Sequence, residues 1–134
     1  MDLLEPNLKN PLTHWYYENK FYFLYKAIFD NLDTIQTVVD VGAGSALFSI
    51  ELARKFPQIN FVAVDINYDN KHLVRGSKNL RYSRKLERGD FYILTDVLEH
   101  IENDFQFLMN LVKSFPNPAI SSQCKNNQKL VLFN

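Results

Sequence analysis

The chain has 134 residues, of which 46% are hydrophobic, 14% aromatic and 22% charged, and this composition is typical of one globular domain. Its 15 Lys and Arg residues balance its 15 Asp and Glu residues, so the net charge gives no general attraction to nucleic acid or to an anionic membrane. One cysteine cannot form an internal disulfide, and no signal peptide or membrane span is recognisable, so we expect a cytoplasmic protein.

Apolar periodicity predicts a helix after a loose N-terminal lead-in of 13 residues. The predicted buried face has the spacing i, i+3, i+4, i+7, i+8 and i+11, and consists of Phe21, Leu24, Tyr25, Ile28, Phe29 and Leu32. Residues 37–41 (TVVDV) are short and β-branched, which indicates a strand buried on both faces of a parallel sheet. A helical pattern at 46–56 and a second buried strand at 60–65 then complete a βαβ unit.

The second half of the chain continues this alternation with weaker signals at first. Residues 70–88 contain a possible short helix (DNKHLVRGSK) and a weak strand (LRYSR). Residues 91–96 predict a third buried strand, and Asn103 or Asp104 can cap a following helix. The apolar face of that helix would carry Phe105, Leu108, Leu111, Val112 and Phe115. With one more possible strand at 129–133, the pattern predicts an α/β, Rossmann-like three-layer sandwich with a mostly parallel sheet.

A turn with two glycines joins the first predicted strand to the helix after it. Gly42 and Gly44 have no Cβ atom, so the backbone can turn tightly and a ligand can approach it. The unpaired N–H groups at the start of the helix would face that ligand. Leu47 stands where a dinucleotide fingerprint has a small residue, and no Gly-Lys-Ser/Thr follows, which argues against NAD, FAD and a Walker loop. A structural turn without a ligand is the alternative.

The stretch VVDVGAGSALFSIELA (38–53) resembles motif I of the class I S-adenosylmethionine (SAM) dependent methyltransferases. Asp65 ends the second strand, 25 residues after Asp40, where these enzymes have an acid that binds both ribose hydroxyls. LTDVLEHIENDFQFLMNL (94–111) is similar to the motif after their fourth strand, and THWYYENKFYFL (13–24) resembles the His-Trp-aromatic segment of many bacterial members. The resemblance implies SAM as cofactor and methyl transfer to an acceptor, which we expect to be a small molecule.

The resemblance implies a cofactor site at the carboxyl ends of the strands. Its residues would be Asp40, Gly42, Ala43, Gly44, Ser45, Asp65, Ile66, Asp96 and Val97. Because ligands in such sheets lie beyond the strand ends where the strand order reverses, we expect the three aspartates to ring one crevice. The alternatives are a plain strand-end acid for Asp65 and support of the following turn for Asp96.

Other candidate residues lie outside the strand ends. His100 and Glu99 are candidates for a general base, or else they are solvated residues at a helix start. His14, Trp15 and Tyr16 either form part of a lid over the cofactor or pack their rings on the sheet. His72 and Cys124 have no partners at metal-ligand spacing, so we expect no metal.

The sequence departs from the family pattern in three places. Ala46 stands where a third glycine is usual, and only 33 residues separate Asp65 from Leu98-Glu99-His100. We expect the shortening to fall on a helix, the third strand and the loop whose acid meets the adenine; Asp90 is either that acid or the acid that opens the next strand. The chain also ends near the fifth of seven strands, which predicts an uncovered sheet edge and possible self-association.

These observations lead to two functional hypotheses for one domain, residues 1–134, with an N-terminal helical segment (1–35) and a SAM-binding core (36–134). The first is an active methyltransferase, and the alternative is a non-catalytic remnant that binds SAM or a partner. Seven of the fifteen basic residues lie within eighteen positions: Lys71, Arg75, Lys78, Arg81, Arg84, Lys85 and Arg88. This run is either a solvated face or holds an anionic substrate; because no nucleic-acid-binding motif is recognised, we do not expect nucleic acid as a partner.

Overall fold

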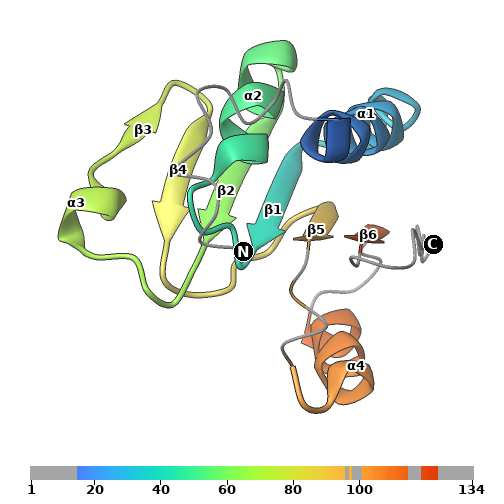
Figure 1. Cartoon of the computed structure of the whole chain (residues 1–134), viewed down its shortest axis with the longest axis vertical. Helices are drawn as coiled ribbons and strands as arrows, with labels where there is room; N and C mark the ends of the chain where they lie inside the picture. The colour runs from blue at the N-terminus through green and yellow to red at the C-terminus, as the bar shows by residue number, and fades with distance from the viewer. Residues whose placement is uncertain (1–14, 96, 98–100, 115–118, 124–134) are drawn as a thin grey trace.

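The computed structural model describes residues 15–95, 97, 101–114 and 119–123. The helices are α1 (Trp15–Phe29), α2 (Leu47–Lys55), α3 (Asn70–Leu73) and α4 (Asp104–Ser114). The strands are β1 (Thr37–Val41), β2 (Asn60–Val64), β3 (Gly76–Ser77), β4 (Leu80–Ser83), β5 (Phe91–Thr95) and β6 (Ala119–Gln123). They form one sheet in the order β3-β4-β2-β1-β5-β6 (Figure 1). β3 pairs antiparallel with β4, and the other neighbours pair in parallel.

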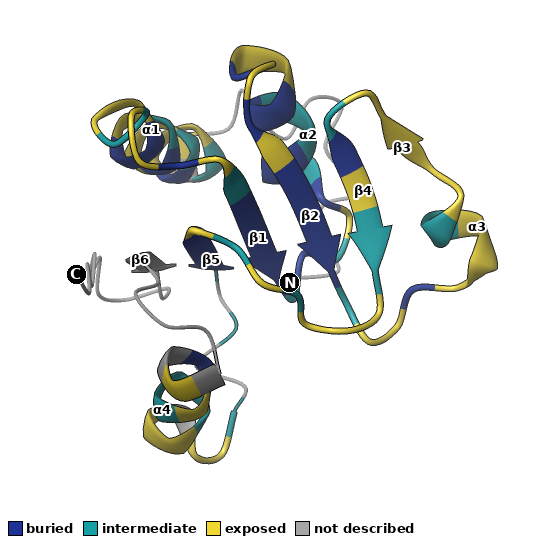
Figure 2. Cartoon of the chain, turned by 180° about the vertical axis from the view of Figure 1, so that it is seen from behind, coloured by how far each residue is buried: buried dark blue, intermediate teal, exposed yellow. Residues whose placement is uncertain are grey.

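The sheet separates two apolar clusters, as a three-layer sandwich requires. Alternate residues of a strand point to opposite faces. Thus Val38 and Phe61 pack with α1 and α2, whereas Val39 and Val62 pack with Leu111 of α4. Figure 2 shows β1 and β2 buried along most of their length between these layers. The predicted Rossmann-like fold is confirmed, and the strand order reverses between β1 and β5, where such folds hold ligands.

The buried face of α1 differs from the predicted one at its C-terminal end. Leu24 and Ile28 are fully buried as predicted, but Phe29 is 55% exposed. Ala27 faces the core instead and is buried in the cluster between α1 and the sheet. Phe29 lies on the solvent side, where its ring stacks on Tyr25 with 6.0 Å between the ring centroids.

The predicted face of α4 is also wrong at Phe105, while the side chain of Val112 and residue Phe115 lie outside the described residues. Phe105 is 70% exposed, whereas Phe107 packs into the cluster around Leu111. Asn103 caps the helix, since its side-chain oxygen accepts a hydrogen bond of 2.9 Å from the Gln106 N–H. This cap fixes where the helix begins, with the exposed Phe105 in its first turn. No described helix is long and apolar enough to cross a membrane.

The two weak predictions within 70–88 are confirmed, and the expected shortening falls on the helix more than on the third strand. α3 is a single turn, but β4 is present and pairs with β2 over four residues. The short connection therefore reduces the helix and keeps the strand. β6 was not predicted, because its sequence AISSQ has two apolar residues and forms a strand by pairing with β5. The predicted strand at 129–133 lies outside the described residues.

Asn79 joins the end of α2 to the start of β4. Its side-chain NH₂ lies 2.9 Å from the Ala53 carbonyl, 3.1 Å from the Phe56 carbonyl and 3.0 Å from the Ile59 carbonyl. The helical donor for the Ala53 carbonyl would be the N–H of residue 57, which is proline and has none. Asn79 thus supplies a donor that the helix end lacks.

We expect Asn79→Ala to lower the free energy of unfolding by about 2 kcal/mol, because it leaves part-buried carbonyls without their donor. Urea denaturation followed by circular dichroism measures this change. Asn60→Ala, at an exposed position of β2, is the control and should cost less than about 0.5 kcal/mol. Equal effects of the two substitutions would contradict this role of Asn79.

Candidate functional site

The turn between β1 and α2 has a left-handed backbone at every second residue. The φ angles are 68° at Gly42, 54° at Gly44 and 58° at Ala46. Between the glycines, Ala43 donates its N–H to the Val64 carbonyl at 3.0 Å, which fixes the turn beside the end of β2. Glycine adopts this conformation freely, whereas it costs an L-residue such as Ala46 about 1–2 kcal/mol. Ala46 is almost fully buried, so packing of its methyl group offsets part of that cost.

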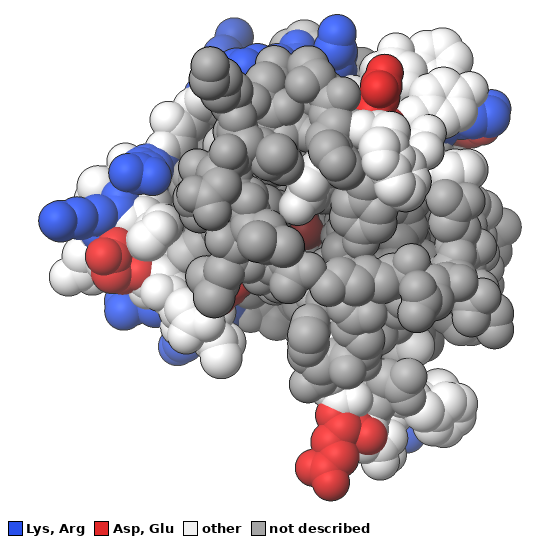
Figure 3. Space-filling view, viewed as in Figure 1, with Lys and Arg blue, Asp and Glu red and all other residues white. Residues whose placement is uncertain are grey.

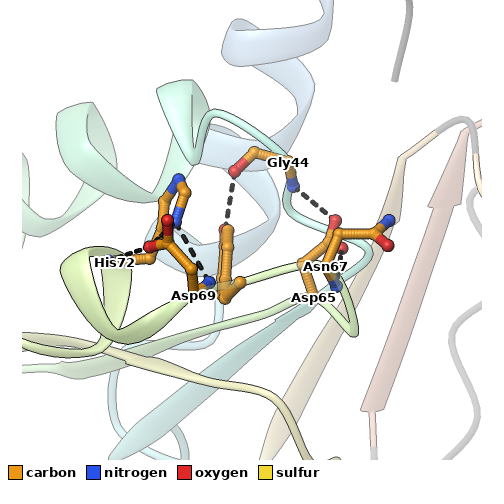
Figure 4. A network of polar contacts seen from close by, with 6 residues as sticks. Gly44, Asp65, Asn67, Asp69 and His72 are labelled. Atoms are coloured by element: carbon orange, nitrogen blue, oxygen red, sulfur yellow. Dashed lines mark hydrogen bonds and ion pairs between the residues drawn. The ribbon is translucent and has the colours of Figure 1, made fainter.

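Asp65 lies at the mouth of this turn, immediately after β2. One carboxylate oxygen accepts the Gly44 N–H at 3.0 Å, and the other accepts the Asn67 N–H at 2.9 Å (Figure 4). The side chain is only partly buried. A carboxylate offers about four acceptor positions, so two backbone donors orient Asp65 and leave each oxygen able to accept another hydrogen bond.

Tyr68 is hydrogen-bonded to the glycine turn, and the sequence did not predict a role for it. Its hydroxyl donates to the Gly44 carbonyl at 2.7 Å, and its ring stacks on His72 at 4.9 Å between centroids. Burial raises the pKa of Tyr68, and the nearby Asp40 and Asp65 raise it further, so the hydroxyl stays a donor. The Nδ1 atom of His72 lies 2.7 Å from Oδ1 of Asp69, the residue that caps the N-terminus of α3. Tyr68 and His72 therefore link α3 to the glycine turn.

Asp40 occupies a different environment from Asp65, although both follow the predicted pattern. It is 4% exposed, and one of its oxygens accepts the Ser49 hydroxyl of α2 at 2.7 Å. Burial raises its pKa from 3.8 to about 7; the Ser49 hydrogen bond lowers the pKa, and the charge of Asp65 raises it. Asp40 thus ties β1 to the first turn of α2 beneath the glycine turn, and its contact with a cofactor stays a prediction.

The remaining predicted residues are only partly described. Val97 lies against the glycine turn, and Ile66 beside Asp65 is 83% exposed. Ser45 and Trp15 are exposed, which leaves a role of Trp15 in a lid untested. The other predicted positions, His14, Asp96, Glu99 and His100, and the side chain of Tyr16, lie outside the described residues. Within the described ranges no group of His, Cys, Asp or Glu side chains could hold a metal ion.

Asp90 opens a strand and does not belong to this site. One of its oxygens accepts the N–H groups of Gln36 and Thr37, each at 2.9 Å, at the start of β1. It therefore lies at the amino end of the sheet, opposite the glycine turn. Of the two predicted roles for Asp90, the structure supports the one that opens β5.

Gly42 has no room for a side chain, and this supports a testable prediction. A Cβ atom there would lie 2.6 Å from a methyl group of Val97, and the backbone φ is positive. We expect Gly42→Ala to lower the free energy of unfolding by about 2–3 kcal/mol in urea denaturation. Adding Val97→Ala should recover the part caused by the clash; no recovery would show that Val97 does not contact position 42.

Comparison with known proteins supports the fold. No protein-family model and no curated protein sequence matches the chain. Among solved structures, coclaurine N-methyltransferase bound to N-methylheliamine and SAH is similar with a TM-score of 0.61 and 15% identity, over 86% of this chain and 37% of that one. The N-methyltransferase NodS from Bradyrhizobium japonicum WM9, in complex with SAH, has a TM-score of 0.58 and 16% identity, over 89% and 69%.

A third similar structure is human N-acetylserotonin methyltransferase in complex with SAM, with a TM-score of 0.57, 17% identity, and coverage of 89% of this chain and 43% of that one. The chain thus has the fold of the class I SAM-dependent methyltransferases, as the sequence resemblance implied. It spans about two fifths of the length of the first and third of these proteins.

Proposed function

We propose that this chain binds SAM at the glycine turn and transfers its methyl group to a small-molecule acceptor. The observation that carries the proposal is the position of Asp65, at the end of β2, hydrogen-bonded to the turn through Gly44. In this class of fold, ligands lie beyond the carboxyl ends of the strands where the strand order reverses. The solved methyltransferases with SAM or SAH bound share this fold.

The chemistry of the turn fits the parts of this cofactor. Each carboxylate oxygen of Asp65 accepts one backbone N–H and has a second acceptor position. Each oxygen can therefore also accept a hydrogen bond from one hydroxyl of a ribose diol. Gly44 has no side chain, so a ligand can approach the main chain of the turn there, whereas the Val97 side chain lies against Gly42. Ile66 presents an exposed apolar side chain next to Asp65, suited to an adenine face.

When bound, SAM supplies an electrophilic methyl group that a nucleophilic atom of the acceptor attacks in line. The contribution of the chain is to hold the cofactor in one orientation so that the reaction has a favourable geometry. Asp65 fixes the ribose, and Asp40 holds α2, and hence the turn, in place. A weakly acidic acceptor needs a base, for which His100 and Glu99 are the candidates; Asp96 and Val97 complete the proposed site.

Isothermal titration calorimetry of the full chain with SAM and with SAH tests cofactor binding. We expect SAM and SAH to bind saturably at one site. ATP and NAD⁺ should bind at least about tenfold more weakly, because the turn lacks the Gly-Lys-Ser/Thr of a Walker loop and the third small residue of a dinucleotide fingerprint. A folded chain that does not bind SAM would rule out the proposal. SAH formation with amine, phenol and carboxylate acceptors then tests turnover; binding without turnover would favour the non-catalytic SAM-binding module.

A further inference from the structure

A second concave site lies at the opposite end of α2 from the glycine turn. It is a pocket of about 490 Å³ between the C-terminal half of α2 and the segment from Arg75 to Tyr82, which includes β3 and the start of β4. None of the residues that line it belongs to the proposed SAM site. A ligand held here would therefore be a second ligand.

The short connection between β2 and β4 explains why this face of the sheet is open. Parallel strands are usually joined by a crossover helix that covers the sheet. Here α3 is only four residues long, so it cannot cover the face of β4 that α2 does not reach. The space that a full helix would fill is the pocket between α2 and β4.

The apolar wall of the pocket is formed by both elements. Ile50, Ala53 and Pro57 contribute from α2 and its end, and Leu80 and Tyr82 contribute from β4. Tyr82 is half-buried, and its ring meets the Tyr68 ring edge-on at 5.4 Å between centroids. This wall is suited to the flat or aliphatic body of an organic molecule.

The charged residues that line the pocket are all cationic. They are Arg54, Arg75 and Lys78, and no Asp or Glu lines it. Arg54 pairs with Glu51 at 2.7 Å, whereas Arg75 and Lys78 make no ion pair within the described part of the chain. Burial raises the pKa of the Tyr82 hydroxyl, and the positive charge of the nearby Arg75 lowers it.

The surroundings of the pocket carry the same charge. The seven-residue basic run falls on α3, on the positions before and after β3, on β4 and on the segment after β4, with Glu87 as the one acid between positions 70 and 88. All seven basic residues are exposed, and Figure 3 shows Lys and Arg along the margin that carries these elements. Arg81 pairs with Glu87, whereas Arg75 and Lys78 at the pocket are not paired within the described residues.

We propose that this pocket binds a small amphipathic anion, with an apolar or aromatic body on the α2–β4 wall and a phosphate or carboxylate group at Arg75 and Lys78. A volume of about 490 Å³ suits a molecule of this size. A localised apolar pocket favours a small anion over an extended polyanion, which would use the whole basic run.

The test is a titration of the full chain with 1-naphthyl phosphate, followed by calorimetry and by NMR chemical-shift changes. We expect saturable binding, with the largest shifts at Tyr82 and Leu80. Arg75→Gln/Lys78→Gln should weaken it about tenfold, whereas Arg84→Gln/Lys85→Gln, which removes the same charge outside the pocket, should change it less than about twofold. Asp65→Asn should leave it unchanged, which separates this site from the proposed SAM site.

Four results would contradict the proposal that this pocket binds an amphipathic anion. They are the absence of 1-naphthyl phosphate binding, an equal loss of affinity for it in the two charge variants, the loss of its binding in Asp65→Asn, and inorganic phosphate binding as tightly as 1-naphthyl phosphate. A dT12 oligonucleotide that binds more tightly than the probe, and equally poorly to both charge variants, would show a general polyanion surface instead. Circular dichroism of each variant checks that these exposed substitutions leave the fold intact.

Discussion

Asp65→Asn is expected to weaken SAM binding by about 100-fold. The substitution keeps the size of the side chain but removes its charge and replaces one acceptor oxygen with a donor NH₂ group. Hydrogen bonds to a charged acceptor contribute about 1.5–3 kcal/mol each, and the loss of one such bond together with weakening of the other corresponds to this factor. Calorimetric titration of both proteins with SAM measures the ratio of dissociation constants.

Asp69→Asn is the matched control for this experiment. Asp69 lies four residues away in the same polar network, and asparagine caps a helix about as well as aspartate (Figure 4). Its affinity for SAM should stay within about twofold of the wild type. If wild type binds SAM and Asp65→Asn binds it equally well, Asp65 is not the ribose ligand and another residue must hold the cofactor.

Asp40→Asn is expected to change how stability depends on pH. Burial raises the folded-state pKa of Asp40 to about 7, above its ordinary value of 3.8, so between these values the folded chain binds a proton that the unfolded chain has lost. This contribution to stability is complete below about pH 4 and is lost as the pH rises through about 7. The loss amounts to about 4 kcal/mol, and asparagine, which does not titrate, removes it.

Urea denaturation at several pH values from 4 to 8 measures this difference. Relative to the wild type, the free energy of unfolding of Asp40→Asn should rise by about 4 kcal/mol from pH 4 to pH 8. The asparagine side-chain oxygen can still accept the Ser49 hydroxyl hydrogen bond. Ser49→Ala removes the hydrogen bond that lowers the pKa of Asp40, so the loss of stability should continue to a higher pH than in the wild type. Parallel stability curves for wild type and Asp40→Asn would contradict a raised pKa at this position.

The glycine turn shows how far local sequence determines the site. The positions of Gly42 and Gly44 were readable because a tight strand-to-helix turn favours residues without a Cβ atom. The positive φ of Ala46 was not, because alanine does not favour that conformation. Asp65 was readable from its place at a strand end. The contacts that complete the turn were not, because Tyr68 reaches Gly44 across 24 positions and no periodicity marks that pairing.

The same distinction separates the two aspartates. Both end buried strands in the sequence, and the prediction treated them alike. In the structure Asp40 is buried against Ser49 and Asp65 lies at the surface of the turn. Which strand-end side chain is covered depends on how α2 packs over β1, and this packing has no local signature.

The sequence by itself determined the alternation of strands and helices, the turn after β1 and the class of fold, because each follows from local periodicity and backbone preference. The tertiary structure alone decided the faces of α1 and α4, the presence of β6, the burial of Asp40 and the open pocket beside α2. These features depend on contacts between residues distant in the chain, whose free energies arise only when the layers pack together.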